Sequence, residues 1–511
     1  MAILMLGFTV SAQLSPGTIE QYLFSSSFSN NDKLLFKAGI KKFYSLLNYN
    51  TAWIQNFNAA DKKKIRDALH SAAGRGLREN DYTSHIADLF LITDKPLQTA
   101  EDSLQAELSI TDAAIHFYSD LVYGNTKPAL SYNGLNYIPD CFDIPGLLAS
   151  VILKNKLQFL LSQLSSALPE TIALENKILR FQSIIENSAF KEIIILPGKL
   201  NAANLPLLQK LQQLGIITDA EKKWPDSMFK NFIKEAQVQF NLPADGLPGP
   251  QLLQQLNVPL TIRFRQLNLS VNYYRWLSCM MQNQSVIVVN LPSALLKVYE
   301  NNKVVLDMRV IVGKKTTPTP TLSATVNEVI LYPYWHVPYS IATKELLPAI
   351  KRNAGFIDAG GYQVLNKNGN ILDPLSINWQ AYSARYFPFI IRQSTGCDNA
   401  LGLLKLNFIN PFSVYLHDTP NKKLFSKQLR FFSHGCMRMD KPMELGHLVL
   451  RHNSIAIDTL TQKGCIVNQS PITVPANNRM PVIVWYNPAG IDAWGRIIYY
   501  DDVYTKFNWM K

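Results

Sequence analysis

The sequence predicts a multidomain α+β protein in which two helical regions precede a mainly β region with one insertion. Three patterns support this fold class. Apolar residues recur every three or four positions from about residue 19 to residue 190, a shorter helical unit occupies residues 198–258, and apolar residues alternate with a period of two from residue 285 onward. A length of 511 residues fits this arrangement, because single domains usually hold ~100–200 residues.

Residues 1–12 predict a signal peptide. They form an apolar run that ends in the small residues Val10-Ser11-Ala12 before Gln13. The run is too short to span a bilayer, which requires about 20 apolar residues. The alternative is an uncleaved apolar N-terminus. No Lys or Arg precedes the run, which leaves open a true start further upstream.

The region from residue 19 to residue 190 predicts a helical domain with a structural role. Helices are expected around residues 43–53, 61–69, 147–161 and 170–185, where apolar residues follow helical spacing. No group of residues in this region has the composition or spacing of a catalytic or metal site.

Residues 198–258 predict a compact unit of three short helices. The leucines of residues 205–214 suit a helix that ends at Gly215, and Asp226 or Ser227 is a candidate N-cap for a second helix. That helix carries Phe and Ile along one stripe, which indicates a core belonging to this unit rather than a ligand platform. The turn-rich segment 242–250 then leads into a third helix.

The C-terminal half predicts a β domain. Strands are expected at residues 286–290, 294–300 and 304–312, with Asn301-Asn302 as a two-residue hairpin turn. An insertion over about residues 338–389 carries a helix of its own, residues 342–353, and glycine-rich turns. A helix is expected over residues 441–452, and residues 466–511 are expected to add terminal strands that pack on this domain.

The most informative residues of the chain are Cys436 and His417. Cys436 lies in the segment Ser-His-Gly-Cys-Met-Arg, residues 433–438, and His417 lies nineteen positions upstream. Both follow strand-like segments that would deliver them to one edge of a sheet. A thiolate is a nucleophile, and an adjacent imidazole lowers the thiol pKa and moves protons. Gly435 lets the backbone approach a substrate closely, so the amides of Gly435 and Cys436 are candidate oxyanion donors.

Other interpretations of these residues stay open at this level. A lone cysteine is usually an inert buried residue. His434, two positions before Cys436, would face the same side of a strand, where it would line the pocket, act as a second imidazole or serve the structure. A zinc site from His417, His434, Cys436 and His447 is conceivable by residue type, although the spacing matches no recurrent zinc pattern.

Charge and cysteine content narrow the class of protein. A formal net charge of +12 and a pI near 9.2 predict attraction to anionic surfaces. Nucleic acid is not indicated, because the chain has no zinc-finger pattern, RNP-like motif or concentrated Lys/Arg tract. If Cys436 is catalytic it stays free, and any disulfides come from the remaining four cysteines, whose pairing and oxidation state are open: Cys141, Cys279, Cys397 and Cys465.

The two segments that contain His417 and Cys436 resemble the active-site signature of the L,D-transpeptidases with a YkuD-type catalytic domain. In that family a segment beginning with histidine, here residues 417–420, is followed at a similar spacing by S-H-G-C-h-R with h apolar, here residues 433–438. The order of the regions resembles the large Gram-negative, YcbB-like branch: a scaffold domain over 19–190, a catalytic domain over 285–465 and a lid insertion. The pattern F-x-L-x-A-D-G-x-x-G-P from Phe240 resembles a peptidoglycan-binding domain, and Pro318-Thr319-Pro320 is a further family landmark.

This resemblance implies a periplasmic enzyme that forms 3→3 cross-links between peptidoglycan stem peptides, in cell wall biogenesis and cell shape. Cys436 would attack a donor tetrapeptide, expel the terminal D-alanine and form a thioester, which the amine of a second stem then attacks. His417 would act as the general base. Asp418 is not expected to complete a triad, because neighbouring residues on an extended segment face opposite ways. A backbone carbonyl is expected to orient His417 instead.

The remaining assignments follow from the same resemblance. Ser433, His434 and Gly435 would line the oxyanion site or pocket, Tyr415 would contact substrate, and Arg438 would hold a stem carboxylate or form a structural ion pair. No metal or cofactor is implied. Expected partners are stem peptides, the sacculus and carbapenem-type inhibitors, without nucleic acid and with peripheral membrane contact at most. The alternatives are an L,D-carboxypeptidase that trims tetrapeptide stems and a non-catalytic wall-binding scaffold.

Overall fold

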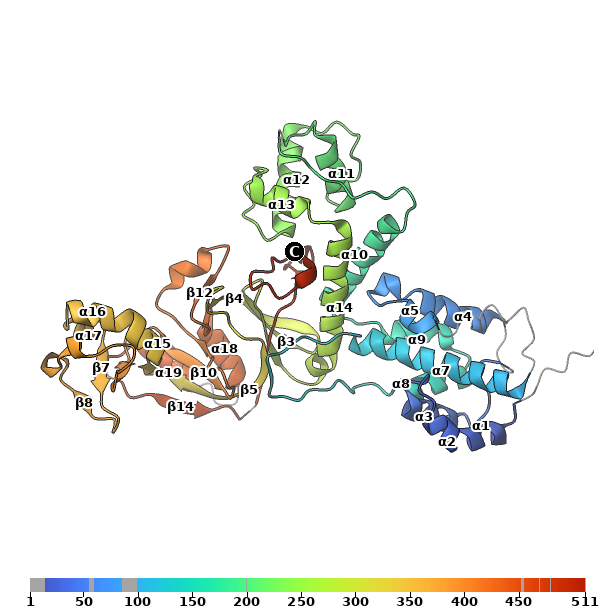
Figure 1. Cartoon of the computed structure of the whole chain (residues 1–511), viewed down its shortest axis with the longest axis horizontal. Coiled ribbons are helices and arrows are strands. Elements are labelled where there is room, and N and C mark those ends of the chain that lie inside the picture. Colours follow the sequence, from blue (N-terminus) through green and yellow to red (C-terminus); the bar gives the residue numbers. More distant parts are fainter. Residues whose placement is uncertain are drawn as a thin grey trace, which may run out of the picture.

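The computed structural model describes residues 14–54, 59–84, 99–198, 200–451, 455–467, 469–477 and 479–510. The predicted signal peptide, residues 1–12, lies outside these ranges. Figure 1 shows a mixed α+β molecule with a helical region at one end, a β region at the other and the long helix α14 between them. Within the described ranges no helix is both long and apolar enough to cross a membrane.

The N-terminal helices surround one long central helix. Helix α7 spans Ala100–Tyr123. Its N-cap is Thr99, whose hydroxyl accepts a hydrogen bond from the Asp102 amide at 3.0 Å. The expected helix at residues 43–53 ends early, because Asn48 and Tyr49 take positive φ. The other elements here are α1 (Pro16–Leu23), α2 (Ser26–Ser29), α3 (Lys37–Leu46), α4 (Ala59–His70), η1 (Ala73–Arg75), α5 (Asn80–Thr83), α8 (Ile144–Leu153) and α9 (Leu157–Leu164).

Helix α14 (Leu260–Asn283), which the sequence patterns did not predict, connects the regions. It is buried along most of its length and packs against α10 (Pro169–Ile185). Its Arg275 guanidinium donates to Glu175 Oε1 on α10 at 2.8 Å, and its Asn272 amide donates to the carbonyl of Gly76 at 2.8 Å. A helix buried on every side carries little amphipathic periodicity, which explains why the pattern missed it.

The unit of residues 198–258 contains the three expected helices, α11 (Leu205–Gln213), α12 (Asp226–Gln239) and α13 (Pro250–Leu256). The N-cap of α12 is Pro225, so neither Asp226 nor Ser227 caps it. The prediction of a separate core is also wrong. The Arg263 guanidinium of α14 lies over the rings of both Phe240 and Tyr499, at 4.7 and 4.9 Å from their centroids. One continuous hydrophobic cluster joins this unit to α10, α14 and the C-terminal strands.

The β region closes into a barrel. Neighbouring strands follow the order β5-β10-β11-β13-β4-β3-β2-β15, and β15 pairs again with β5. The β3–β4 hairpin turns at Asn301 and Asn302, both at positive φ, as predicted. The strands are β2 (Val286–Asn290), β3 (Leu295–Glu300), β4 (Lys303–Gly313), β5 (Leu322–Leu331), β10 (Leu404–Phe408), β11 (Leu416–His417), β12 (Phe431–Ser433), β13 (Met437–Met439), β14 (Ile472–Pro475) and β15 (Pro481–Trp485).

The C-terminal segment is part of the barrel rather than a layer packed on it. Strand β15 lies between β2 and β5 inside the sheet, and β14 pairs with β5, so the expectation for residues 466–511 is corrected for these two strands. The hairpin of β16 (Ala489–Ile491) and β17 (Ile497–Tyr499) packs on α10, α12 and α14 instead. The remaining elements are η6 (Lys422–Ser426), α18 (Pro442–Val449), α19 (Ile455–Lys463) and η7 (Asn508–Met510).

The insertion forms a small subdomain with its own sheet and core. Its strand order is β6-β9-β7-β8, and its hydrophobic cluster is separate from that of the barrel. The expected helix over 342–353 is a π-helical turn, η3 (Ala342–Leu346), followed by α16 (Leu347–Arg352). The other elements are β6 (Trp335–His336), α15 (Tyr339–Ile341), α17 (Phe356–Ala359), β7 (Tyr362–Leu365), β8 (Ile371–Leu372), η4 (Pro374–Ser376), η5 (Trp379–Ala381) and β9 (Ile390–Gln393).

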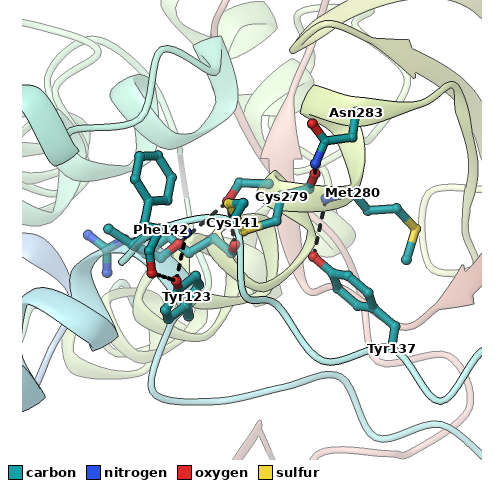
Figure 2. The surroundings of a disulfide bond; sticks show 10 residues. Tyr123, Tyr137, Cys141, Phe142, Cys279, Met280 and Asn283 are labelled. Carbon is teal, nitrogen blue, oxygen red and sulfur yellow. Dashed lines mark hydrogen bonds between the residues drawn. A yellow bond between two sulfur atoms is a disulfide. The ribbon is translucent and has the colours of Figure 1, made fainter. Parts of the chain in front are cut away.

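Two disulfides, whose pairing the sequence left open, fasten the regions to one another. Cys397–Cys465 joins the end of the insertion to the segment after α19. Cys141–Cys279 joins the extended segment 124–143 to α14 (Figure 2), and the Met280 amide beside it donates to the Tyr137 hydroxyl at 3.1 Å. The same segment contributes β1 (Tyr132–Asn133), which pairs with β5. The helical region is therefore attached covalently and by strand pairing to the rest of the molecule.

Candidate active site

The barrel brings the two motif segments side by side. His417 on β11 pairs with Arg438 on β13 and with Lys405 on β10. Directly paired residues in a sheet project to the same face, so the three side chains share one face of the barrel. Strands β11 and β13 are parallel neighbours, which places Cys436, the residue before β13, next to the start of β11.

Cys436 and His417 line the same cavity, which has a volume of ≈ 330 Å³. It lies between the barrel and the insertion, and both contribute to its wall. The lining residues are Thr317, Trp335, Pro338, Ser340, Ile341, Glu345, Ala400, Leu401, Tyr415, His417, Ser433, His434, Cys436 and Arg438. Six of the seven residues that the sequence analysis named for the site line this cavity. The seventh, Gly435, lies in the same loop.

A main-chain carbonyl fixes the orientation of the His417 ring. Its Nδ1 lies 2.5 Å from the carbonyl oxygen of Asp418, so Nδ1 carries the proton and donates it, while Nε2 keeps its lone pair. The ring is buried, and burial together with the Arg438 guanidinium lowers the pKa of His417 to about 3. The imidazole is therefore neutral at physiological pH and able to accept a proton at Nε2.

The Asp418 carboxylate faces away from His417. Its Oδ2 accepts the Leu403 amide at 2.9 Å and its Oδ1 accepts Lys422 Nζ at 2.7 Å. Gly402, at φ +60, brings the backbone so close that a Cβ there would lie 2.3 Å from the carboxylate. The carboxylate thus shapes the 402–403 turn, and the carbonyl, as expected, orients the histidine.

Cys436 lies in a bend between β12 and β13, and its Sγ is 3.9 Å from the carbonyl oxygen of Ser413. It is the free cysteine among the described residues. Burial raises the pKa of its thiol, and Tyr415, Lys405 and Arg438 only partly oppose this effect. The expectation of an imidazole-lowered thiol pKa is therefore wrong for the resting site, which holds a neutral thiol and a neutral imidazole.

His434 does not share a strand face with Cys436, because residues 434–436 are not in a strand and Gly435 has φ +122. Its Nε2 lies 2.8 Å from Glu345 Oε1 on the insertion. Both side chains are partly exposed. The ring thus connects the nucleophile loop to the insertion, which favours the structural interpretation over a second imidazole.

Tyr415 and Arg438 complete the polar wall. The Tyr415 ring packs edge-on against His417, with centroids 5.6 Å apart, and Lys405 Nζ lies 4.0 Å above the same ring. Arg438 lines the cavity, and its Nε is buried without a hydrogen-bond partner in the described part of the chain. Sequence reasoning missed Lys405 and Glu345 as site residues, since strand pairing and the insertion bring them in from distant segments.

A metal site is not formed by the residues of the zinc alternative. In the described part of the chain, no group of three or more His, Cys, Asp or Glu side chains is arranged to hold a metal ion. His447 instead lies on α18, with its Nε2 3.5 Å from Asp458.

Known families match two regions of this chain. The model of the YkuD L,D-transpeptidase catalytic domain matches residues 284–457, and the model of the Scaffold domain matches residues 38–177. A Haemophilus influenzae protein provisionally named an L,D-transpeptidase is 35% identical over 232 residues, which are 44% of this chain and 46% of the relative. The chain thus spans about half the length of the curated relative it matches.

Solved structures of L,D-transpeptidases show weaker similarity. The enzyme of Mycobacterium smegmatis is 14% identical over 39% of this chain and 58% of its own, with a TM-score of 0.17. That of Xylanimonas cellulosilytica is 13% identical over 57% of this chain and 97% of its own, with a TM-score of 0.18. Scores this low carry no argument about the chain's arrangement.

Proposed function

We propose that this chain, which belongs to the L,D-transpeptidases by its YkuD catalytic domain and its Scaffold domain, forms 3→3 cross-links between peptidoglycan stem peptides through a Cys436 thioester. The observation that carries the proposal is the free Cys436 thiol in one cavity with His417, whose Nδ1 is fixed by a carbonyl. Such a pair suits acyl transfer to and from sulfur.

The chemistry proceeds from a neutral pair. As the Cys436 sulfur bonds to the carbonyl carbon of the donor stem, the thiol proton passes to His417 Nε2 and the carbonyl electron pair moves onto oxygen. The tetrahedral intermediate collapses, the C–N bond breaks, and the imidazolium returns its proton to the leaving amine of D-alanine. His417 then takes a proton from the acceptor amine as that amine attacks the thioester carbonyl. The new tetrahedral intermediate collapses, the C–S bond breaks, and the imidazolium returns its proton to the departing Cys436 sulfur. The Arg438 guanidinium faces the same cavity and offers a donor to a stem carboxylate.

An exported, wall-associated location belongs to the same proposal. Two disulfides are typical of an oxidising compartment such as the periplasm. A net charge of +12 favours association with an anionic envelope.

Incubation of the full chain with disaccharide-tetrapeptides, followed by mass analysis, tests the proposal. A cross-linked dimer is expected, with no product from the Cys436→Ser variant. A tripeptide monomer alone would favour the L,D-carboxypeptidase, in which water takes the place of the acceptor amine. No product at all would favour a non-catalytic wall-binding protein.

Carbapenems provide a second test, because their ring carbonyl can occupy the position of the stem carbonyl. We expect one carbapenem adduct per chain, on Cys436, by intact-mass and peptide analysis. An adduct on another residue, or none, would contradict this use of the cavity.

A further inference from the structure

A buried threonine from another part of the barrel contacts the nucleophile loop. Thr319, in the segment between β4 and β5, lies behind residues 433–436 and is not among the residues that line the cavity. We propose that Thr319 is a positioning residue that aims the Cys436 amide N–H at the substrate carbonyl, so that this amide acts as an oxyanion donor. The inference rests on the acyl-transfer function proposed above.

The direction of the Thr319 hydrogen bonds is determined by their partners. The Gly313 amide donates to Thr319 Oγ1 at 2.9 Å, so the hydroxyl oxygen acts there as an acceptor. The single hydroxyl proton is then given to the carbonyl oxygen of Gly435, 2.8 Å away. The contact is buried, so water does not compete for it.

That carbonyl belongs to the same peptide unit as the Cys436 N–H. In a planar trans peptide the C=O and N–H bonds point in opposite directions. Holding the Gly435 oxygen on the buried side therefore turns the Cys436 N–H away from Thr319. Gly435 has φ +122, a conformation that suits glycine and whose peptide a glycine can rotate at little cost. A fixed hydrogen bond is needed to select one orientation.

The Gly435 amide and the Cys436 carbonyl of this loop already have partners. The Gly435 amide donates to Ser433 Oγ at 3.2 Å, and Ser433 Oγ donates to the Cys436 carbonyl at 2.6 Å. The sequence-based assignment of Gly435 N–H as an oxyanion donor is therefore not supported. In the described part of the chain the amides of His434 and Cys436 make no hydrogen bond, and of these two only the Cys436 amide shares a peptide unit with the carbonyl that Thr319 holds. That amide is left for a developing oxyanion.

The Thr319 side chain is itself rigidly placed. Pro318 and Pro320 restrict the backbone on both sides of it. Gly313 lets this segment approach the end of β4, since a Cβ there would lie 2.2 Å from the Thr317 carbonyl oxygen. The Tyr504 hydroxyl, from the C-terminal segment, donates to the Gly313 carbonyl at 2.6 Å and fixes the end of β4 against which Thr319 lies. A rigid donor of this kind is what preorganised stabilisation of a transition state requires.

Two small probes of Cys436 separate positioning from thiol reactivity. Acylation by p-nitrophenyl acetate forms a tetrahedral oxyanion before p-nitrophenolate leaves. Alkylation by iodoacetamide displaces iodide from a saturated carbon and forms no oxyanion. We expect Thr319→Val to lower the acylation rate about 10- to 100-fold, less than the loss of a whole oxyanion donor. The alkylation rate and its pH profile should stay within about twofold of the wild type, and Thr319→Ser should restore acylation.

Thr321→Val is the matched control. Thr321 is also buried, two positions away, but its hydroxyl donates to the Ala129 carbonyl at 3.0 Å and not to the loop. Its ratio of acylation to alkylation should equal that of the wild type. Thr319→Ala replaces Thr319→Val if the valine variant does not fold. An unchanged ratio in the Thr319 variants, or an equal fall of both rates, would overturn the proposal. Neither probe is a stem peptide, so absence of cross-linking would count against the proposed function alone.

Discussion

The helical region of residues 14–164 and the catalytic barrel both bury ionisable side chains, but they treat the surrounding polar atoms differently. In the helical region, the Glu107 carboxylate accepts the backbone amides of Ala52, Trp53 and Ile54 and the Tyr44 hydroxyl. Among the described residues 14–164, no buried side-chain nitrogen or oxygen lacks a partner. Among the described residues 286–485 of the β region, four such atoms lack a partner: Asn302 Oδ1, Arg430 Nε, Arg438 Nε and Trp485 Nε1.

A buried polar group without a partner costs about 1–3 kcal/mol, and the described part of the helical region avoids this cost. In the barrel, the unpartnered group that bears on the site is Arg438, because it lines the cavity. The barrel leaves a guanidinium donor, the Cys436 amide and the His417 Nε2 lone pair unused on one side of the cavity. Under the proposed function, a bound substrate supplies partners for these groups.

Cys436→Ser should abolish cross-linking, by at least about 10³-fold, because a serine hydroxyl is far less acidic than a thiol and the site has no charged base to activate it. The free energy of unfolding should change little. Product formation by mass analysis measures the first effect and thermal unfolding the second. Cross-linking at a tenth of the wild-type rate would remove Cys436 from the nucleophile role.

His417→Ala should lower the rate about 10²–10⁴-fold, since it removes the group that accepts the thiol proton. His434→Ala should cost less, because His434 pairs with Glu345 on the insertion rather than with the thiol. Steady-state rates of the two variants provide the comparison. If the His434 variant is the more impaired, the two roles must be exchanged.

Glu107→Ala should lower the free energy of unfolding by about 3 kcal/mol or more, because it removes the buried carboxyl group that accepts the backbone amides of Ala52, Trp53 and Ile54. Urea unfolding monitored by circular dichroism measures this loss, and acylation of the folded variant should be unchanged. Glu101→Ala, at an exposed position of the same helix, is the control and should stay within about 0.5 kcal/mol of the wild type.

The two buried groups should give opposite pH dependences of stability. Burial lowers the pKa of His417 to about 3, so the unfolded chain binds the extra proton and the free energy of unfolding decreases as pH falls from about 6.5 toward 3. Burial raises the pKa of Glu107 to about 7, so its contribution is complete below about 4.5 and is lost as pH rises through 7. Each slope is at most about 1.4 kcal/mol per pH unit.

His417→Gln and Glu107→Gln separate these contributions. The first variant should remove the loss of stability on acidification, and the second the loss on raising the pH. Unfolding curves collected from pH 4 to pH 8 provide the measurement. Equal pH profiles for both variants and the wild type would show that other groups dominate the titration.

Local patterns in the sequence were enough for much of the fold. The change from helical to alternating periodicity near residue 285 marks the start of the barrel, and Asn301-Asn302 predicts the hairpin because few residues tolerate positive φ. The same local patterns did not predict α14, because a helix buried on all sides shows little amphipathic periodicity. They also predicted a separate core for the three-helix unit, whereas Arg263 and Tyr499 from distant segments complete that core.

For the site, the sequence by itself predicted the chemical class, because a cysteine after glycine and a histidine at the family's spacing point to acyl transfer through sulfur. Only the tertiary structure decided which groups contact one another and how their side chains are oriented. It paired His417 with Arg438 and Lys405, turned His434 toward Glu345, and joined Cys141 to Cys279 and Cys397 to Cys465. It also decided the protonation of the resting pair, since a pKa depends on burial and on charges that distant strands bring within reach.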